Sequence, residues 1–398
     1  MSSSEDNAGF DALQPYPFEK LRQLLNGIKP AIPDAIPLSI GEPRHEPPGF
    51  VLDAYRNALM EGVSRYPTIQ GSEALRDACR GWLDRRFGVH VADDMVQPVN
   101  GTREALFAVA QAFVRSGSGQ KILMPNPFYQ IYEGAALMAG AVPHYLNVVS
   151  DDDFLPDLNA IDSETFAATR IFYLCSPVNP CGTVASLSYL QRLIELAIRY
   201  DFIVVADECY IELYRDAAPV SILNAAETLS LPRPCANVLA FHSLSKRSNL
   251  PGLRSGFVAG DADLISRYRA YRTYHGCSMS LAVQEASIAA WRDDAHVAEN
   301  RELYNEKFAD AHRILSTALD VAIPPAAFYL WPNVGGDDVA FCRELFAHTH
   351  VTAVPGSYLS REVSGINPGY GYVRLSLVAD PDATRTALER IAAFIRGD

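Results

Sequence analysis

A chain of 398 residues is long enough for one large domain and a smaller one, and 48% hydrophobic with 20% charged residues is an ordinary globular composition. The net charge of −13 argues against nucleic acid or an anionic membrane surface as a partner, although it allows a cationic pocket for a small anion. The seven cysteines are odd in number and never in CxxC spacing, so we expect reduced thiols and no metal site.

The N-terminus begins with polar residues and lacks the basic and apolar regions of a signal peptide. No apolar run approaches the length that crosses a membrane. We therefore expect a soluble, cytoplasmic protein without membrane contacts. A proline-rich arm comes first and includes a short amphipathic helix at residues 19–26.

From about residue 50 the pattern alternates helices with short apolar strands. Helices are expected over residues 52–61, 72–87 and 101–116. Strands are expected over residues 121–124, 170–174, 202–206, 238–241 and 256–259. Apolar runs separated by helices are typical of buried parallel strands, so the sequence predicts an α/β fold with a mostly parallel, doubly wound sheet that binds ligands at the carboxyl ends of its strands.

The C-terminal part predicts a smaller α+β unit. A long helix over residues 282–319 leads into strands at 327–331, 351–354 and 372–377 and a closing helix at 383–395. We expect the arm, 1–45, to join the small domain, 46–285 to form the large cofactor-binding domain, and 286–398 to form the rest of the small domain.

The first candidate site lies at the start of the helix predicted at 101–116. Gly101, Thr102 and Arg103 form its first turn. Backbone N–H groups and the helix dipole at such a position suit a phosphate dianion. An ordinary N-cap explains the same residues, so this motif alone leaves both interpretations open.

Two proline-containing turns follow predicted strands. In Asn126-Pro127-Phe128-Tyr129, Tyr129 can lie on a flat ring, although core packing is the usual role of a single aromatic residue. In the turn at 175–183, two prolines and a glycine hold Asn179 outward, where it can donate to an anionic ring oxygen or simply form part of the turn.

The strand predicted at 202–206 is followed by the carboxylates Asp207 and Glu208. A carboxylate at a buried strand end needs a cation, and a protonated pyridine nitrogen would provide one. A helix cap and a Mg²⁺ ligand are the alternatives. Tyr210 could donate to a phenolic oxygen on the same ring or serve only in packing.

Lys246 follows a buried strand and lies among small hydroxyl residues. Because an unpaired buried ammonium is costly, a neutral amine that forms an imine with an aldehyde is a chemical reason for this position. Ser243 and Arg254 could bind a phosphate group on the same loop. These features together predict pyridoxal phosphate on Lys246.

Arg374 lies in the alternating strand predicted at 372–377. A cation on such a strand usually faces solvent. As a functional residue it would bind a substrate carboxylate with two N–H groups.

The order of these motifs resembles that of the class I and II aminotransferases of fold type I over nearly the whole chain. The matching segments are Tyr66-Pro67 with Gly71 and Leu75-Arg76, then 100–106, 177–182, 207–210, 243–254 and Arg374. The resemblance implies pyridoxal 5′-phosphate as the cofactor and no metal. It implies that Lys246 binds the cofactor covalently and carries a proton between the substrate Cα and the cofactor C4′.

The resemblance also assigns the other site residues. It places Asp207 at the pyridine nitrogen, Asn179 and Tyr210 at the ring oxygen and Tyr129 on the ring. It gives the phosphate to the backbone of Gly101, Thr102 and Arg103, to Ser243 and Arg254, and to Tyr66 of a second subunit, so a homodimer is implied. The substrate α-carboxylate goes to Arg374, with Asn179 and the backbone of Gly41.

The segments at 15–21, 40–48 and 271–277 look like the proteobacterial succinyldiaminopimelate aminotransferases of lysine biosynthesis. This resemblance implies a ping-pong exchange between glutamate or 2-oxoglutarate and N-succinyl-diaminopimelate. Candidates for binding the distal succinyl carboxylate are Arg44, equally well interpreted as a solvated loop residue, and the loop 274–280. We expect His242 and His275 to be structural.

The sequence departs from the family pattern at two positions. Cys181 stands where threonine is usual, and Ala326 where glycine is common, which puts a close backbone approach at Ala326 in doubt. Aspartate, alanine, aromatic amino acids and acetylornithine are alternative substrates, and a β-lyase or decarboxylase is an alternative reaction on the same fold. A non-enzymatic regulator fits poorly with the short arm and the acidic charge, and a class I aldolase gives no role to Asp207 and Asn179 together.

Overall fold

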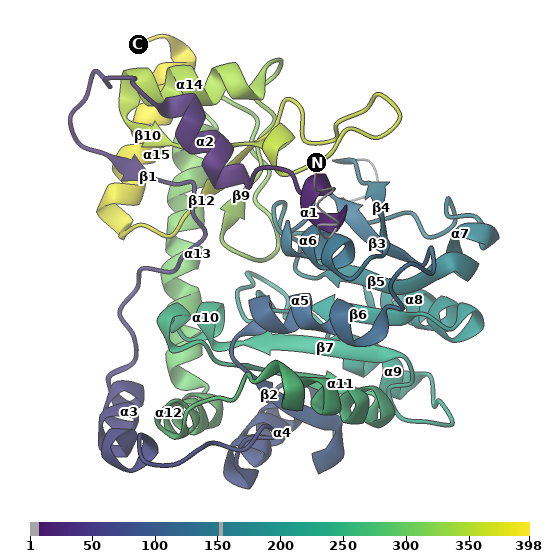
Figure 1. Ribbon diagram of the computed structural model, residues 1–398. Coiled ribbons are helices and arrows are strands. Elements are labelled where there is room, and N and C mark those ends of the chain that lie inside the picture. Colours follow the sequence, from purple (N-terminus) through teal and green to yellow (C-terminus); the bar gives the residue numbers. More distant parts are fainter. Residues whose placement is uncertain (1–7, 151–153) are drawn as a thin grey trace, which may run out of the picture.

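The computed structural model describes residues 8–150 and 154–398. The first seven residues of the predicted arm lie outside this description. Figure 1 shows a large lower body built on a sheet and a smaller upper body that contains the C-terminal helices.

The large body is built on a seven-stranded sheet with the strand order β2-β8-β7-β6-β5-β3-β4. The five strands from β7 to β4 are parallel to their neighbours, whereas β8 is antiparallel to both β7 and β2. The strands are β2 (Val96–Val99), β3 (Lys121–Asn126), β4 (Val142–Asn147), β5 (Thr169–Cys175), β6 (Ile203–Asp207), β7 (Val238–Ser243) and β8 (Gly256–Gly260). The predicted mostly parallel α/β fold is confirmed; β2 and β4 were not predicted.

Both faces of this sheet are buried, because alternate residues of each strand enter different hydrophobic clusters. In β6, Ile203 and Val205 pack in one cluster, while Val204 and Ala206 pack in the other. The period-two alternation of a strand produces this division. The helices around the sheet are α3 (Gly49–Gly62), α4 (Glu73–Phe87), α5 (Thr102–Phe113), α6 (Ile131–Met138), α7 (Ser163–Ala168), α8 (Leu187–Tyr200), α9 (Ile222–Thr228), α11 (Ala262–His275) and α12 (Leu281–Arg292).

The helix predicted over 282–319 is two helices, α12 and α13 (Ala295–Leu315). The guanidinium of buried Arg247 lies at the break between the two helices. Its Nη2 donates to the carbonyl of Asp293 at 2.9 Å and to Asp294 Oδ1 at 2.8 Å. Those bonds satisfy polar groups that a helix end exposes. In Figure 1, α13 runs from beside α12 up to the smaller body.

The smaller body combines both ends of the chain. The strand β1 (Ile36–Pro37) pairs in parallel with β10 (Val351–Thr352), and a three-stranded antiparallel sheet has the order β11 (Val354–Pro355), β12 (Val373–Ser376), β9 (Tyr329–Leu330). Its helices are α2 (Pro17–Leu25), α14 (Asp338–Thr349) and α15 (Pro381–Arg396), whereas α1 (Ala8–Ala12) lies against α6 of the large body. No helix in the described part of the chain has the length and apolar character that a membrane span requires.

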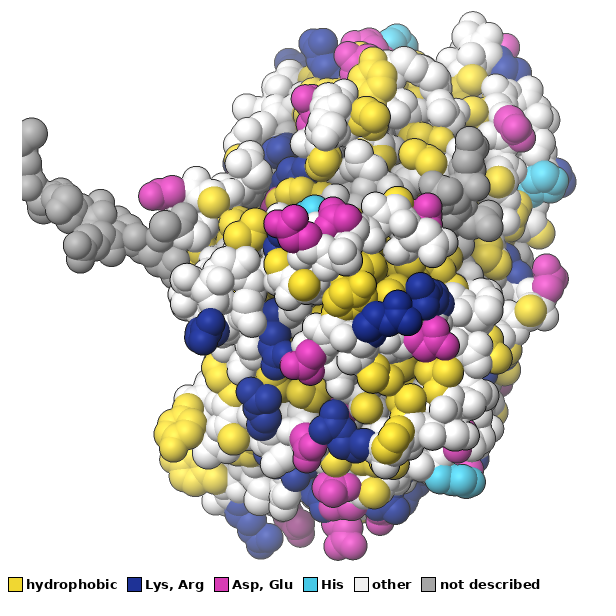
Figure 2. Space-filling view, turned by 90° about the vertical axis from the view of Figure 1, so that its right-hand side faces the viewer, with side chains coloured by type: hydrophobic (Ala, Val, Ile, Leu, Met, Phe, Trp, Pro, Cys, Tyr) yellow, Lys and Arg dark blue, Asp and Glu magenta, His cyan; other side chains and the backbone are white. Residues whose placement is uncertain are grey.

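The surface carries both signs of charge. On the face drawn in Figure 2, acidic and basic side chains are interspersed among hydrophobic and uncharged ones.

Candidate active site

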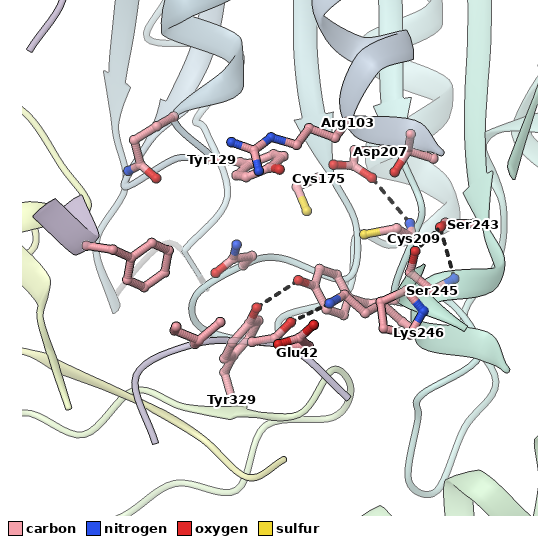
Figure 3. A pocket seen from close by; sticks show the side chains of 18 of the residues that line it. Glu42, Arg103, Tyr129, Cys175, Asp207, Cys209, Ser243, Ser245, Lys246 and Tyr329 are labelled. Atoms are coloured by element: carbon pink, nitrogen blue, oxygen red, sulfur yellow. Dashed lines mark hydrogen bonds between the residues drawn. The ribbon is translucent and has the colours of Figure 1, made fainter. Parts of the chain in front are cut away.

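A cavity of about 500 Å³ lies between the carboxyl ends of β5, β6 and β7 and the strands β9 and β12 of the smaller body. Parallel strands bring their carboxyl ends to one edge, so residues from distant motifs meet there. The predicted site residues that line the cavity are Gly41, Thr102, Arg103, Tyr129, Asn179, Asp207, Tyr210, Ser243, Lys246, Arg254 and Arg374. Figure 3 shows several of these side chains pointing into the same space.

Lys246 lies in α10 (Leu244–Arg247), directly after β7. Its Nζ donates to the carbonyl oxygen of Gly41 and lies 5.1 Å from the centre of the Phe328 ring. Desolvation is the main cause that lowers the pKa of the Lys246 amine to about 8; Cys209 opposes the shift and Arg374 adds to it. The amine is therefore deprotonated far more readily than that of a solvated lysine.

Asp207 is a buried carboxylate at the end of β6. Its Oδ2 accepts from the hydroxyl of Tyr132 at 2.8 Å, and its Oδ1 accepts from the backbone N–H of Cys209 at 3.3 Å. Burial raises the pKa of Asp207, and these hydrogen bonds oppose that increase. Within the described residues it has no ion-pair partner, so the site suits a ligand that brings its own cation.

Tyr210 lies near Asp207 but bonds to a residue of the smaller body. Its hydroxyl is 2.8 Å from that of Tyr329, and both side chains are buried. The ring of Tyr329 also lies 4.6 Å from the guanidinium carbon of Arg374.

Arg374 faces the cavity and not solvent. Its Nη1 donates to Asn179 Oδ1 at 3.0 Å and its Nη2 to the carbonyl of Ser39 at 2.8 Å, whereas its Nε is buried and has no partner among the described residues. The segment that contains Ser39 covers this strand, since Ser376 N donates to the carbonyl of Leu38. A buried guanidinium without a carboxylate partner suits an anionic ligand.

The start of α5 and the α10 loop provide donors for a phosphate. Gly101 has a positive φ of 82°, and its N–H donates to the carbonyl of Val99, so the donors available at this helix end belong to Thr102 and Arg103. The positive φ favours glycine there, and a Cβ would also meet the guanidinium end of Arg254, which would have to move aside.

The α10 loop provides further donors for the phosphate. Ser243 Oγ bonds to Ser245 Oγ at 3.0 Å, and both serines line the cavity.

Four predicted positions are not among the described residues that line the cavity: Gly101, Tyr66, Tyr274 and Arg44. Tyr66 is completely exposed, Tyr274 is 94% exposed, and Arg44 lines a neighbouring cavity. The assignment of Arg44 or Tyr274 to the distal substrate carboxylate is not supported within one chain. His242 lies outside the cavity too: it packs against Trp82 and Phe257, and burial lowers its pKa to about 3.

Sequence reasoning missed four residues of this site. Tyr132 and Tyr329 carry no motif, and only their long-range hydrogen bonds show a role. Ser245 adjoins Lys246 and was an available candidate. The side chain of Arg103 lines the cavity and lies 5.7 Å from the Tyr16 ring, whereas only its backbone was predicted to act.

A possible cation site occurs elsewhere. Glu104, His275 and Cys277 have ligand atoms within 4.8 Å of one another. Arg272 already donates to both oxygens of Glu104, at 2.9 and 3.0 Å, and neutralises its charge.

Comparison with known proteins identifies the family. The profile described as aminotransferase class I and II matches residues 33–391. An LL-diaminopimelate aminotransferase of Nitratidesulfovibrio vulgaris is 31% identical over 389 residues, which cover 96% of each chain. The crystal structure of an aminotransferase from Neisseria meningitidis Z2491 has a TM-score of 0.94 at 44% identity and covers 98% of this chain and 100% of that one. Aminotransferase AspB from Helicobacter pylori 26695 has a TM-score of 0.90 at 36% identity, with coverages of 97% and 100%.

The chain therefore belongs to the class I and II aminotransferases, a family that depends on pyridoxal 5′-phosphate. The residues present fit that cofactor on two observations. Asp207 is a buried carboxylate without a cationic partner among the described residues, and Thr102, Ser243 and Arg254 place phosphate donors on the same cavity as Lys246. The predicted family and cofactor are confirmed.

Proposed function

We propose that this aminotransferase exchanges amino groups between glutamate or 2-oxoglutarate and N-succinyl-diaminopimelate. The observation that carries the substrate class is Arg103: its side chain lines the same cavity as Arg374 and forms no ion pair within the described residues. A second cationic group suits a substrate that carries a carboxylate in addition to its α-carboxylate, as N-succinyl-diaminopimelate does. Arg374 would bind the α-carboxylate and Arg103 the distal one.

The roles of the remaining residues follow from their positions. Bound pyridoxal phosphate supplies an aldehyde and a ring that accepts electrons. Lys246 Nζ, whose lowered pKa makes the neutral amine readily accessible, would remove the proton from the substrate Cα. Asp207 would keep a proton on the ring nitrogen, Asn179 and Tyr210 would hold the ring oxygen, and Tyr129 would cover the ring.

A second substrate, LL-diaminopimelate, is favoured by relatives 29–31% identical to this chain that are named LL-diaminopimelate aminotransferases. Its distal end carries an ammonium as well as a carboxylate, and Glu42 also lines the cavity. The two proposed substrates differ in the charge of the distal nitrogen, because succinylation converts the distal ammonium into a neutral amide.

A panel of amino donors separates these substrates. We expect turnover with N-succinyl-diaminopimelate to exceed that with LL-diaminopimelate, acetylornithine, aspartate, alanine and aromatic amino acids. A preference for LL-diaminopimelate would replace the first proposal with the second. Release of pyruvate and ammonia, or of CO₂, without a keto-acid acceptor would instead indicate a lyase or decarboxylase.

Arg103→Met tests the distal contact while leaving the backbone N–H in place. We expect KM for N-succinyl-diaminopimelate to rise about 10- to 100-fold, which corresponds to loss of a hydrogen bond to a charged group. KM for alanine, which has no distal carboxylate, should change little. Arg44→Met is the matched control, since Arg44 lines a different cavity and should leave both values unchanged. Equal effects on the two donors would contradict the assignment of Arg103.

We also propose a homodimer in which Tyr66 of one subunit completes the cofactor site of the other. Its support is that Tyr66 is completely exposed, with Met60 and Val63 exposed nearby at 82% and 78%. Such apolar residues grouped on one helix end favour burial against another chain. The seven unpaired cysteines support a reducing compartment such as the cytoplasm.

A further inference from the structure

Tyr329 connects the smaller body to the cofactor side of the cavity. It begins β9 and pairs with Ser376 of β12, and its hydroxyl reaches the hydroxyl of Tyr210, a residue that follows β6 of the large sheet. The bond is 2.8 Å long and joins side chains that are 2% and 5% exposed. Figure 3 shows Tyr329 at the cavity wall beside Glu42.

Tyr329 also supports the side chain of Arg374. The two residues lie on adjacent antiparallel strands, where Arg374 is two positions from Ser376, the partner of Tyr329. Diagonal neighbours of this kind share a face of the sheet. The guanidinium carbon lies 4.6 Å from the Tyr329 ring centre, within the range of a cation–π contact.

A third contact involves the segment that holds the lysine. A Cβ added to Gly41 would collide with the Tyr329 hydroxyl, so the backbone of Gly41 lies directly against this side chain. The carbonyl of Gly41 accepts from Lys246 Nζ. Tyr329 thus contacts Tyr210 and Arg374 directly and contacts Gly41, whose carbonyl accepts from Lys246. The proposed reaction depends on all three of Tyr210, Arg374 and Lys246.

We propose that Tyr329 is a positioning residue that couples recognition of the substrate carboxylate to the ring oxygen of the cofactor. This inference rests on the proposed roles of Tyr210 and Arg374. A phenol has one O–H, so if Tyr210 donates to the ring oxygen, Tyr329 must donate to Tyr210. The donated bond makes Tyr210 a stronger donor, because hydrogen bonds in a chain polarise one another.

Tyr329→Phe removes this donor and keeps the ring beneath Arg374. A weaker bond from Tyr210 stabilises the anionic ring oxygen less, so the pH at which the visible absorbance band of the bound cofactor titrates should rise by about half a unit to one unit. In the same variant KM for glutamate should rise several-fold, because the ring on which Arg374 rests is no longer fixed by a hydrogen bond to Tyr210.

Tyr304→Phe is the matched control. Tyr304 is 1% exposed in the same aromatic cluster, and its hydroxyl has no partner within the described residues. It should leave both the titration midpoint and KM unchanged. Tyr329→Phe should add nothing to the midpoint shift when combined with Tyr210→Phe, since the hydroxyl acts through Tyr210.

An unchanged midpoint in Tyr329→Phe, or a full additional shift in the double variant, would overturn the coupling. A rise in KM without a shift of the midpoint would overturn it too, because Tyr329 would then support Arg374 alone. Failure of the proposed function is recognised separately. In that case the wild-type protein would bind no pyridoxal phosphate, or its spectrum would not respond to glutamate.

Discussion

Lys246 combines a lowered pKa with a position on the cavity wall. At pH 7.5 a lysine with a pKa of about 8 is roughly one quarter neutral, whereas a solvated lysine is neutral in about one molecule in a thousand. Only the neutral amine attacks an aldehyde. Desolvation therefore prepares this side chain for the cofactor before any cofactor arrives.

The rate at which the apo protein takes up pyridoxal phosphate should follow this pKa. We expect the rate to rise through pH 8 and to level off near pH 9, because Lys246 is half neutral at its pKa of about 8 and roughly nine tenths neutral one pH unit higher. Stopped-flow absorbance of the developing yellow colour measures it, with Nα-acetyl-lysine as the control that continues to rise. A protein rate still rising through pH 10 would contradict the lowered pKa.

The hydrogen bond from Tyr132 should determine how Asp207 meets the ring nitrogen. In Tyr132→Phe the carboxylate loses a bond that lowers its pKa, so the dissociation constant for pyridoxal phosphate should rise about tenfold or more. The loss of affinity on acidification should begin at a higher pH, because only ionised Asp207 pairs with a protonated ring.

Tyr173→Phe controls for general destabilisation. Tyr173 stacks on Tyr132 at 4.5 Å, but its hydroxyl donates to the carbonyl of Leu106 and not to Asp207. We expect a comparable loss of stability, about 1 kcal/mol, with unchanged cofactor affinity in a titration of the apo protein. Equal affinities of the two variants would show that the bond to Asp207 has no such role.

Among the secondary-structure elements, the start of α5 is where the residue type at one position, Gly101, is most restricted. Gly101→Ala combines an unfavourable positive φ with a collision against Arg254, so it should lower cofactor affinity by about tenfold or more through loss of a charge-assisted bond. Gly88, which ends α4 at a φ of 68°, has open space where a Cβ would stand.

Gly88→Ala should therefore lose about 1–2 kcal/mol of unfolding free energy without a change in cofactor affinity. Thermal melts and titration of the two apo variants separate strain from collision. If Gly101→Ala bound the cofactor as tightly as Gly88→Ala does, Arg254 would be shown to move aside without loss of cofactor affinity.

Gly182 resolves the doubt raised by Ala326. Ala326 N donates to the carbonyl of Gly182 at 3.2 Å, and a Cβ on Gly182 would collide with the carbonyl of Ala326. The close backbone approach is therefore kept, and the glycine that permits it lies in the other segment.

At the scale of the whole molecule, we propose domain boundaries at residues 45 and 285. One hydrophobic cluster contains Ile36, Leu38 and Ile391, and within the described residues none of its members lies between 39 and 307. The two chain ends thus share a core that is separate from the clusters on the large sheet.

The proposed dimer predicts complementation between two inactive chains. Lys246→Ala removes the amine and Tyr66→Phe removes the hydroxyl that the partner needs. In a mixed dimer with a shared two-fold interface both defects fall in one site and the other site is intact. Co-refolding equal amounts should restore about a quarter of wild-type activity, since half of randomly formed dimers are mixed.

If Tyr66 served its own chain, every site in the mixture would keep one defect and no activity would return. Sedimentation of the wild-type protein measures the oligomeric state independently. A monomer with full activity would contradict the proposed dimer.

The motifs at strand ends could be predicted because they depend on local sequence. An apolar run followed by Asp207 or Lys246 indicates both the strand and the polar residue at its end, and parallel topology brings such ends to one edge. The same local signal explains why Asn179 and Thr102 were found. None of these inferences depended on which distant segments of the chain pack together.

Other features depend on contacts between segments far apart in the chain. Alternation along its strand suggested that Arg374 faces solvent, but the segment around Ser39 covers it and leaves its guanidinium in the cavity. The bond between Tyr210 and Tyr329 and the helix break at Asp293 likewise depend on distant partners. The sequence by itself therefore determined the family, the fold and many of the residues that line the cavity, whereas only tertiary packing decided burial, hydrogen-bond partners and the exclusion of Tyr66 from the cavity of a single chain.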